Sequence, residues 1–313
     1  NALHLDNEDE TKKWIVADTK WVQEINVPTI VLSLGIQKSF DPKISPDSVD
    51  LTLSETQRKF LAEIEARQTR PAIAVRGATT ARACEQAGIS HCVIMGCPSL
   101  AISTLPDLGQ AIGKKWNELM LKLRRQERIK VALVMAKILP TGEDKMVNQL
   151  MVDLTKQHDG IFITQVQSDK VALASSGVDA LKSREFDNVE DWRKLTAEVD
   201  LVFTGRIHGG MAGIASATPT VVITTDYRIQ ELAEAMRIPR LDMTTVAQVV
   251  NAKSSNLLLD LLEEVEVDFG AFERNRKERL FNYTYILQEV GLEMNPPLLE
   301  IAKEFAGSRV SVQ

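Results

Sequence analysis

The chain has few of the residues from which metal and disulfide sites are built. Its 313 residues include only three cysteines, Cys84, Cys92 and Cys97. Their number is odd, and their spacing fits neither a zinc site nor a secreted disulfide framework. The four histidines include no pair at the i, i+4 spacing of a zinc-protease helix. We therefore expect no metal ion, no cofactor and a reducing compartment.

Excess positive charge and long apolar runs are also lacking. The formal net charge is −6, which excludes the basic footprint that nucleic-acid backbones require. No apolar run reaches the ~20 residues needed to cross a bilayer, so no transmembrane segment is expected in the chain shown. These features favour a cytoplasmic protein. Because the chain opens with Asn1 rather than Met, an upstream signal or anchor stays open.

Apolar runs alternate with segments of helical periodicity along most of the chain. Such alternation indicates βαβ units around parallel sheets, and continuous apolar character indicates strands that are buried on both faces. The runs richest in Val, Ile and Leu are Thr29–Leu34, Ala72–Val75, His91–Met95, Ile129–Val134, Gly160–Thr164, Leu201–Thr204 and Thr220–Thr224. The segment from Ser54 to Gln68 carries the apolar spacing of a helix. The sequence therefore predicts an α/β protein.

The length exceeds what one hydrophobic core usually supports, so we expect two domains. A charged stretch at residues 124–128 precedes a new strand. We place the boundary there, with an N-terminal domain at residues 1–126 and a C-terminal domain at 127–313. Beyond residue 243 no further strand is expected, and the chain reads as a tail of successive helices.

The most informative segment runs from Asp200 to Thr224 and predicts a strand, a tight turn, a helix and a second strand. Gly205 and Gly209 allow close backbone approach in the turn. Arg206 and His208 then lie at the carboxyl end of a buried strand and at the start of a helix. Parallel sheets bind ligands at that edge, where a helix amino terminus favours anions. Arg206 could hold a phosphate or carboxylate, and His208 could donate a proton. The alternative is a structural ion pair for Arg206 and a merely satisfied polar role for His208.

Other cations end predicted strands in the same way. Arg228 follows the last strand, where Asp226 could neutralise it, and Arg76 ends a strand ahead of a helix that we expect to be capped by threonine. Lys137 follows the strand at 129–134 and is a weaker candidate for the same pocket. Cys97 could be a nucleophile, but no histidine is near it in the sequence, and the following Pro98 and Ser99 favour a loop and a helix cap.

Taken together, these motifs resemble the polysaccharide pyruvyl transferase family over roughly residues 28 to 242. The resemblance is carried by Val75-Arg76-Gly77, Gly88-Ile89, Gly96-Cys97-Pro98-Ser99, Gly205-Arg206-Ile207-His208-Gly209, Pro219, Arg228 and Leu232. Its most specific element is the Arg-x-His motif between a strand and a helix. A Gly- and Asn-rich loop that usually follows the first strand in this family is not found before Thr29, which leaves the acceptor side of the cleft open.

The resemblance implies two Rossmann-like domains that face a cleft, as in GT-B glycosyltransferases. It further implies transfer of pyruvate from phosphoenolpyruvate to a sugar diol of an exopolysaccharide or cell-wall glycan, as a ketal and without a metal. The C-terminal domain would bind the donor and the N-terminal domain the acceptor. Arg206 and Arg76 would then clamp the donor, and His208 would be the general acid.

Two other functions remain open at this point. A GT-B glycosyltransferase would hold the diphosphate of a nucleotide sugar with the same arginine and helix terminus. A non-catalytic homologue that binds glycans would be compatible with the missing loop.

Overall fold

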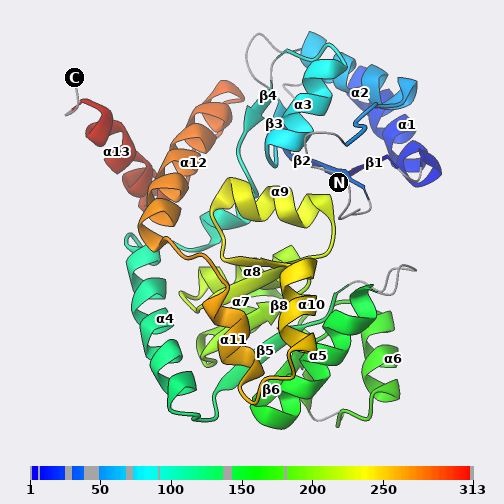
Figure 1. The fold of residues 1–313 in the computed structure, drawn as a ribbon. Helices are drawn as coiled ribbons and strands as arrows, with labels where there is room; N and C mark the ends of the chain where they lie inside the picture. The colour runs from blue at the N-terminus through cyan, green and yellow to red at the C-terminus, as the bar shows by residue number, and fades with distance from the viewer. Residues whose placement is uncertain are drawn as a thin grey trace. The chain divides into compact units, whose positions relative to one another are not determined.

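The computed structural model describes residues 2–5, 8–24, 30–38, 49–67, 73–90, 92–136, 143–179 and 182–310. These residues form an α/β protein in which all strand pairs are parallel (Figure 1). The chain divides into two compact units, each built around one sheet. The first unit comprises residues 1–104, 226–236 and 274–313, and the second comprises 105–225 and 237–273.

This division differs from the single boundary expected at residues 126 and 127. Helix α4 (Leu108–Arg124) belongs to the second unit because its apolar face, with Trp116 and Leu119, lies in that unit's core. Residues 226–236 and 274–313 return to the first unit instead of remaining with the preceding strands. A boundary read along the chain cannot reproduce units that interleave in sequence.

The first unit has a four-stranded sheet in the order β1-β2-β3-β4. Its strands are β1 (Ala2–His4), β2 (Val31–Gln37), β3 (Ile73–Val75) and β4 (Cys92–Ile94). Its helices are α1 (Glu8–Glu24), α2 (Glu55–Ala66), α3 (Ala78–Gln86), the 3-10 helix Pro98–Ile102, α9 (Tyr227–Met236), α13 (Pro296–Val310) and the later part of α12 (Phe269–Glu289). Ala74 and Met95 pack against Leu280, Tyr283 and other residues of the last two helices.

Local sequence explains most of these boundaries and corrects two expectations. Ser54 caps α2 through a reciprocal pair with Gln57, because each side chain accepts a hydrogen bond from the other residue's backbone N–H. The expected threonine cap of α3 is wrong: the N-cap is Gly77, and Thr80 lies inside the first turn. The 3-10 helix is likewise preceded by Cys97, so Ser99 is not its cap.

The second unit has a six-stranded sheet in the order β10-β9-β8-β5-β6-β7. Its strands are β5 (Lys130–Val134), β6 (Asp159–Ile163), β7 (Ser183–Arg184), β8 (Leu201–Thr204), β9 (Thr220–Thr224) and β10 (Arg240–Asp242). Besides α4, its helices are α5 (Glu143–Gln157), α6 (Gln167–Ser175), α7 (Val189–Ala197), α8 (Ile207–Ala215), α10 (Met243–Asn251), α11 (Leu257–Glu263) and the start of α12. The helical tail expected after residue 243 is confirmed.

Helices cover both faces of the second sheet. Val131 and Leu133 of β5 point into a core shared with α4, α5, α10 and α11. The alternate residues Ala132 and Val134 point into the opposite core, which Trp192 and Leu195 of α7 help to build. This alternation follows from the two-residue period of a strand, and it makes the sheet doubly wound.

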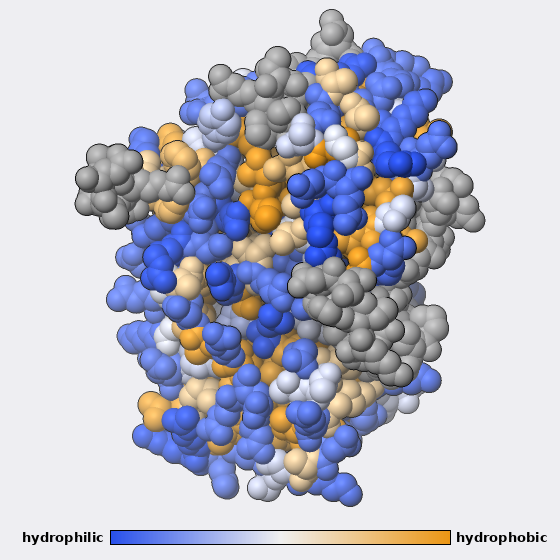
Figure 2. Space-filling model, turned by 45° about the horizontal axis from the view of Figure 1, so that its top comes forward, coloured by the Kyte–Doolittle hydropathy of each residue, from blue (hydrophilic) through white to orange (hydrophobic). Residues whose placement is uncertain are grey.

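The seven strands expected from apolar runs are all present, and Leu201–Thr204 and Thr220–Thr224 match in both bounds. The first residues expected for three of the others, Thr29, Ala72 and His91, lie outside the described residues. Among the described residues we find no helix with the length and apolar character to span a bilayer. On the face shown in Figure 2, hydrophilic side chains predominate and apolar ones are interspersed among them.

Candidate active site

The strand order of the second sheet reverses between β5 and β8. From β5 the chain continues to β6 and β7 on one side of the sheet and to β8, β9 and β10 on the other. This is the strand order of the Rossmann fold, in which ligands bind where the order reverses. Gly205 and Arg206 follow β8 directly. The Arg-x-His motif therefore lies at the point where the order reverses.

Gly205 makes a close backbone contact at this point. Its N–H donates to the Val134 carbonyl at the end of β5, at 2.9 Å. A Cβ atom at position 205 would lie 2.7 Å from the Cβ and 2.8 Å from the Cα of Ala136. Since real Cβ atoms do not approach backbone so closely, only glycine fits here without a backbone shift. The two chain segments that leave β5 and β8 are thereby held against each other.

Arg206 is the N-cap residue of α8 and is fixed at both backbone and side chain. Its N–H donates to Thr204 Oγ1 at 2.9 Å, and the Thr204 hydroxyl donates to the Arg206 carbonyl at 2.7 Å. Its guanidinium donates to Asp169 through Nη1 to Oδ2 at 2.8 Å and Nη2 to Oδ1 at 2.6 Å. The exposed fractions are 13% for the Arg206 side chain and 2% for that of Asp169. The ion pair that the sequence left open as an alternative is thus present.

His208 lies in the first turn of α8, and its side chain is exposed. The rest of α8 consists of small and apolar residues that pack closely on the sheet. A Cβ atom on Gly209 would lie 2.8 Å from Val134 Cγ2, and one on Gly213 would lie 2.5 Å from Thr220 Oγ1. The glycines thus let α8 lie directly on β5, β8 and β9 while its first turn stays at the carboxyl edge of the sheet.

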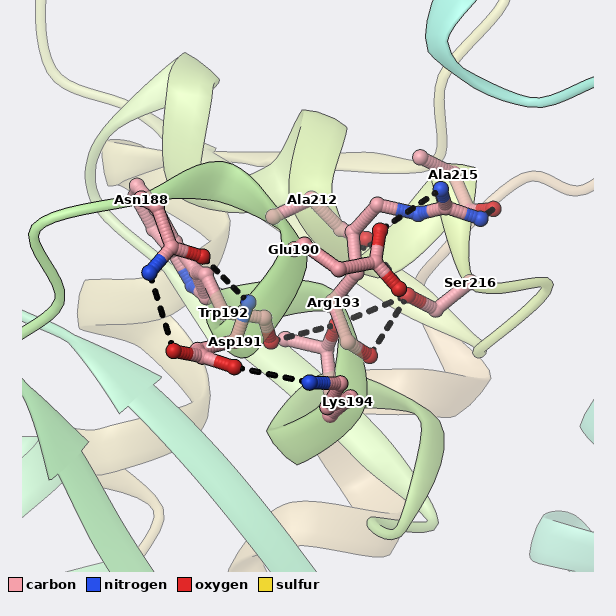
Figure 3. Close-up of polar contacts among 10 residues, drawn as sticks. Asn188, Glu190, Asp191, Trp192, Arg193, Lys194, Ala212, Ala215 and Ser216 are labelled. Atoms are coloured by element: carbon pink, nitrogen blue, oxygen red, sulfur yellow. Dashed lines mark hydrogen bonds and ion pairs between the residues drawn. The ribbon is translucent and has the colours of Figure 1, made fainter.

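The far end of α8 is braced by α7 (Figure 3). Ser216, the C-cap of α8, donates from its hydroxyl to the Arg193 carbonyl at 2.9 Å. Arg193 in turn donates to the Ala215 carbonyl at 3.5 Å. The start of α7 is capped by Asn188, which accepts from the Asp191 N–H at 2.8 Å. These contacts tie the carboxyl-terminal end of α8 to α7.

Arg76 belongs to the first unit and lies at the end of β3, as expected. Its Nε donates to the carbonyl of Ser33 at 3.1 Å and to the Ser33 hydroxyl at 3.3 Å. Its Nη1 is buried and has no hydrogen-bond partner among the described residues. Burial, followed by repulsion from Arg228, lowers the pKa of Arg76. A guanidinium with an unused buried donor is the kind of group that an anionic ligand satisfies.

Arg228 lies on α9, in the first unit, four residues after the carboxyl end of β9. Its Nη1 donates to Gln37 Oε1 at the end of β2, at 3.3 Å. Its Nη2 lies 3.5 Å from Asp226 Oδ2, so the neutralising partner that the sequence offered is present. The chain passes from the second unit to the first directly after Thr225, so a common site for Arg228 and Arg206 stays a prediction.

Glu231 is a buried carboxylate beside these arginines that the sequence analysis missed. It accepts hydrogen bonds from the backbone N–H and the hydroxyl of Thr80 in the first turn of α3. Burial raises its pKa to about 7, although both Thr80 hydrogen bonds and the charge of Arg76 oppose the shift. The Thr80 hydroxyl also accepts from the Ile36 N–H at 3.1 Å. These bonds tie α9 to α3 and to the end of β2.

Cys97 and Tyr283 complete the surroundings of Arg76. Cys97 is buried, and its sulfur accepts a hydrogen bond from the Ser99 hydroxyl at 2.9 Å. Tyr283 Oη is buried without a partner among the described residues, and burial together with the charge of Cys97 raises the pKa of Tyr283. Tyr283 comes from α12, nearly two hundred residues further along the chain than Cys97, and no local motif connects the two.

The structure thus sorts the predicted site residues into two groups. Gly205, Arg206, His208 and Gly209 meet at the reversal point of the second sheet, and Arg76 and Arg228 lie in the first unit. Lys137 lies outside the described residues. Convergence of the two groups on one cleft stays a prediction. Within the described residues, no group of three or more His, Cys, Asp or Glu side chains is placed to hold a metal ion.

Comparison with known proteins identifies the family. The family model described as polysaccharide pyruvyl transferase matches residues 17–227, which is more than half of the chain. The chain belongs to the polysaccharide pyruvyl transferase family. No curated protein matches it. A similar solved structure is that of a dipicolinate synthase subunit from Bacillus halodurans, with 15% identity over 77% of this chain and 81% of that one and a TM-score of 0.26.

Proposed function

We propose that this polysaccharide pyruvyl transferase transfers pyruvate from phosphoenolpyruvate to two hydroxyl groups of a sugar in a glycan, as a ketal. The observation that carries the proposal is the position of Arg206 and His208 at the reversal point of a Rossmann-ordered sheet. An anion there meets the amino terminus of α8, the remaining N–H groups of Arg206 and the His208 imidazole.

The donor brings a phosphate and a carboxylate, so its binding calls for several cations. Arg206 uses two of its five N–H donors on Asp169, which leaves three for a ligand. Arg76, with its unused buried Nη1, would be the second clamp, and Arg228 lies near it in the same unit. We propose that the two units face a cleft as in GT-B enzymes, with the donor on the side of Arg206.

The chemical step needs one proton at carbon and two new carbon–oxygen bonds. His208 would donate a proton to the methylene carbon of phosphoenolpyruvate, which becomes the methyl group of the product. The oxygen of the first sugar hydroxyl attacks C2. The oxygen of the second hydroxyl then also bonds to C2, and the bond from C2 to the phosphate oxygen breaks. One of the two hydroxyl protons returns to His208, and the other passes to the departing inorganic phosphate. The step therefore balances without a further reactant.

Release of inorganic phosphate tests this function directly. Incubation with phosphoenolpyruvate and a glycan acceptor should yield phosphate and a ketal methyl signal in equal amounts. Calorimetric titration should show binding of phosphoenolpyruvate and none of uridine diphosphate. Binding of only the nucleotide would favour a glycosyltransferase, and binding of neither donor would favour a non-catalytic homologue.

Removal of the proposed clamp tests the assignment of Arg206. Arg206→Ala should weaken phosphoenolpyruvate binding by about 2 to 4 kcal/mol, because a charged hydrogen-bonding partner is lost. Unchanged affinity in the folded variant would remove Arg206 from the donor site.

A further inference from the structure

Asp169 holds the arginine of the Arg-x-His motif by both ends of its carboxylate. Oδ1 accepts from Arg206 Nη2 at 2.6 Å and Oδ2 accepts from Nη1 at 2.8 Å. Such paired, charge-assisted bonds fix the plane of a guanidinium as well as its position. Arg206 is therefore oriented before any ligand arrives.

The same carboxylate is itself fixed by the turn that precedes α6. Oδ2 accepts from the backbone N–H of Gln165 at 2.8 Å and from that of Val166 at 3.2 Å. With the two bonds from Arg206, Oδ2 accepts three hydrogen bonds and Oδ1 accepts one, so the carboxylate is held from both sides. Because the Asp169 side chain is only 2% exposed, a substrate does not reach the carboxylate, and Asp169 acts through Arg206.

The topology gives this ion pair a bridging position. Helix α6 follows β6 and α8 follows β8, and these two strands flank β5 on opposite sides. The pair therefore links the two sides of β5 at its carboxyl end, where Gly205 lies against Ala136. This is the reversal point at which the donor is proposed to bind.

We infer that Asp169 is a positioning residue of the pyruvyl-transfer site, which holds Arg206 and the first turn of α8 in place across the end of β5. This inference rests on the proposed function and assigns a role to a residue outside the Arg-x-His motif. A buried ion pair is in general weak evidence for stability, because desolvation offsets the attraction. Its orienting effect on the three remaining Arg206 donors is the property that the geometry supports.

A pair of isosteric variants tests the inference. Asp169→Asn removes the charge and one of the two acceptors for Arg206, and Asp191→Asn makes the same change at the third residue of α7, where the side chain is exposed. Asp169→Asn should lower kcat on the order of 10²-fold with a smaller change in KM for phosphoenolpyruvate, because the clamp is displaced. Asp191→Asn should leave both constants unchanged. Unchanged kcat in folded Asp169→Asn would overturn the inference.

Arg206→Lys provides a second test of the same inference. Lysine keeps the charge but cannot make the paired contact, so kcat should fall by a similar factor. In the Arg206→Lys background, Asp169→Asn should cause little further loss, because it acts through Arg206. Fully additive losses would show that Asp169 acts by another route and would contradict the proposal.

Hydrogen exchange separates this inference from the proposed function. The amides of residues 205–210 should exchange faster in Asp169→Asn than in the wild type and should be unchanged in Asp191→Asn. This holds whether or not the protein uses phosphoenolpyruvate, so an inactive wild type would defeat the proposed function and leave the positioning role measurable. Equal exchange of residues 205–210 in all three proteins would defeat the positioning role itself.

Discussion

Glu231 of α9 accepts two hydrogen bonds from Thr80 of α3, one from its backbone N–H at 2.5 Å and one from its hydroxyl at 2.8 Å. The two residues are 151 positions apart in the chain. The contact joins the segment 226–236, which carries Arg228, to the turn that follows Arg76. One buried carboxylate thus connects the two segments that carry the proposed anion-binding arginines of the first unit.

Ionisation of Glu231 should make stability depend on pH. Burial raises its folded-state pKa from 4.5 to about 7. A raised pKa means that the folded state binds the proton more tightly, so this contribution is present below about pH 4.5 and is lost as the pH rises through about 7. The expected loss is about 3 kcal/mol. Urea unfolding across this range should show a flatter profile in Glu231→Gln than in the wild type. Glu85→Gln, at an exposed position of α3, should keep the wild-type dependence of stability on pH. The same pH dependence in all three proteins would show that Glu231 is not the titrating group.

The buried ion pair between Arg206 and Asp169 leads to a separate prediction about the free energy of unfolding. Arg206→Ala leaves a buried carboxylate without its cation and should cost about 3 to 5 kcal/mol. Adding Asp169→Asn should recover part of this loss, because the uncompensated charge is removed. The exposed pair of Arg124 and Glu263 provides the comparison, and Arg124→Ala should cost at most about 1 kcal/mol. The free energy of unfolding should be measured for the wild type, Arg206→Ala, the double variant and Arg124→Ala. Equal losses of stability in Arg206→Ala and Arg124→Ala would show that the buried ion pair contributes no more than the exposed one.

The central strands could be predicted from the sequence because burial on both faces gives continuous apolar runs. Leu201–Thr204 and Thr220–Thr224 are buried at every position. Strands β1, β7 and β10 were missed because they are two or three residues long and contain polar residues instead of an apolar run. So short a segment has no periodicity to detect.

The site was predictable only where its residues are close in sequence. Gly205, Arg206 and His208 stand together, and their glycine-rich setting indicates a turn at a strand end. Asp169 and Glu231 were missed because their partners are 37 and 151 residues away. Asp169 lies in the first turn of α6, where acidic residues are common, and Glu231 lies further along α9, so nothing local marks either as part of a site.

Gly205→Ala should destabilise the protein by about 1 to 3 kcal/mol, because the new Cβ meets the backbone of Ala136 and a main-chain shift is needed. Gly113→Ala in the interior of α4 is the matched change. Its Cβ would lie nearest to the Phe269 side chain, at 3.1 Å, and alanine favours the helix by about 0.5 to 1 kcal/mol. Melting temperatures should therefore fall for the first variant and stay level or rise for the second. A Gly205→Ala protein as stable as the wild type would mean that the contact with Ala136 is not tight.

The assignment of His208 as the general acid predicts a loss of turnover without a loss of stability. Its side chain is exposed in the first turn of α8, so His208→Gln should leave the melting temperature nearly unchanged. Phosphoenolpyruvate affinity should be largely kept, because Arg206 and the helix amino terminus remain. Turnover should fall by a factor on the order of 10² to 10⁴, since glutamine cannot transfer a proton.

His158→Gln is the contrasting variant, because His158 is buried and packed beside Arg128. This variant should have a lower melting temperature, while its turnover per folded molecule stays intact. Calorimetry, phosphate release and thermal unfolding measured on both variants would decide the assignment. Near-normal turnover in His208→Gln would leave proton transfer to another group.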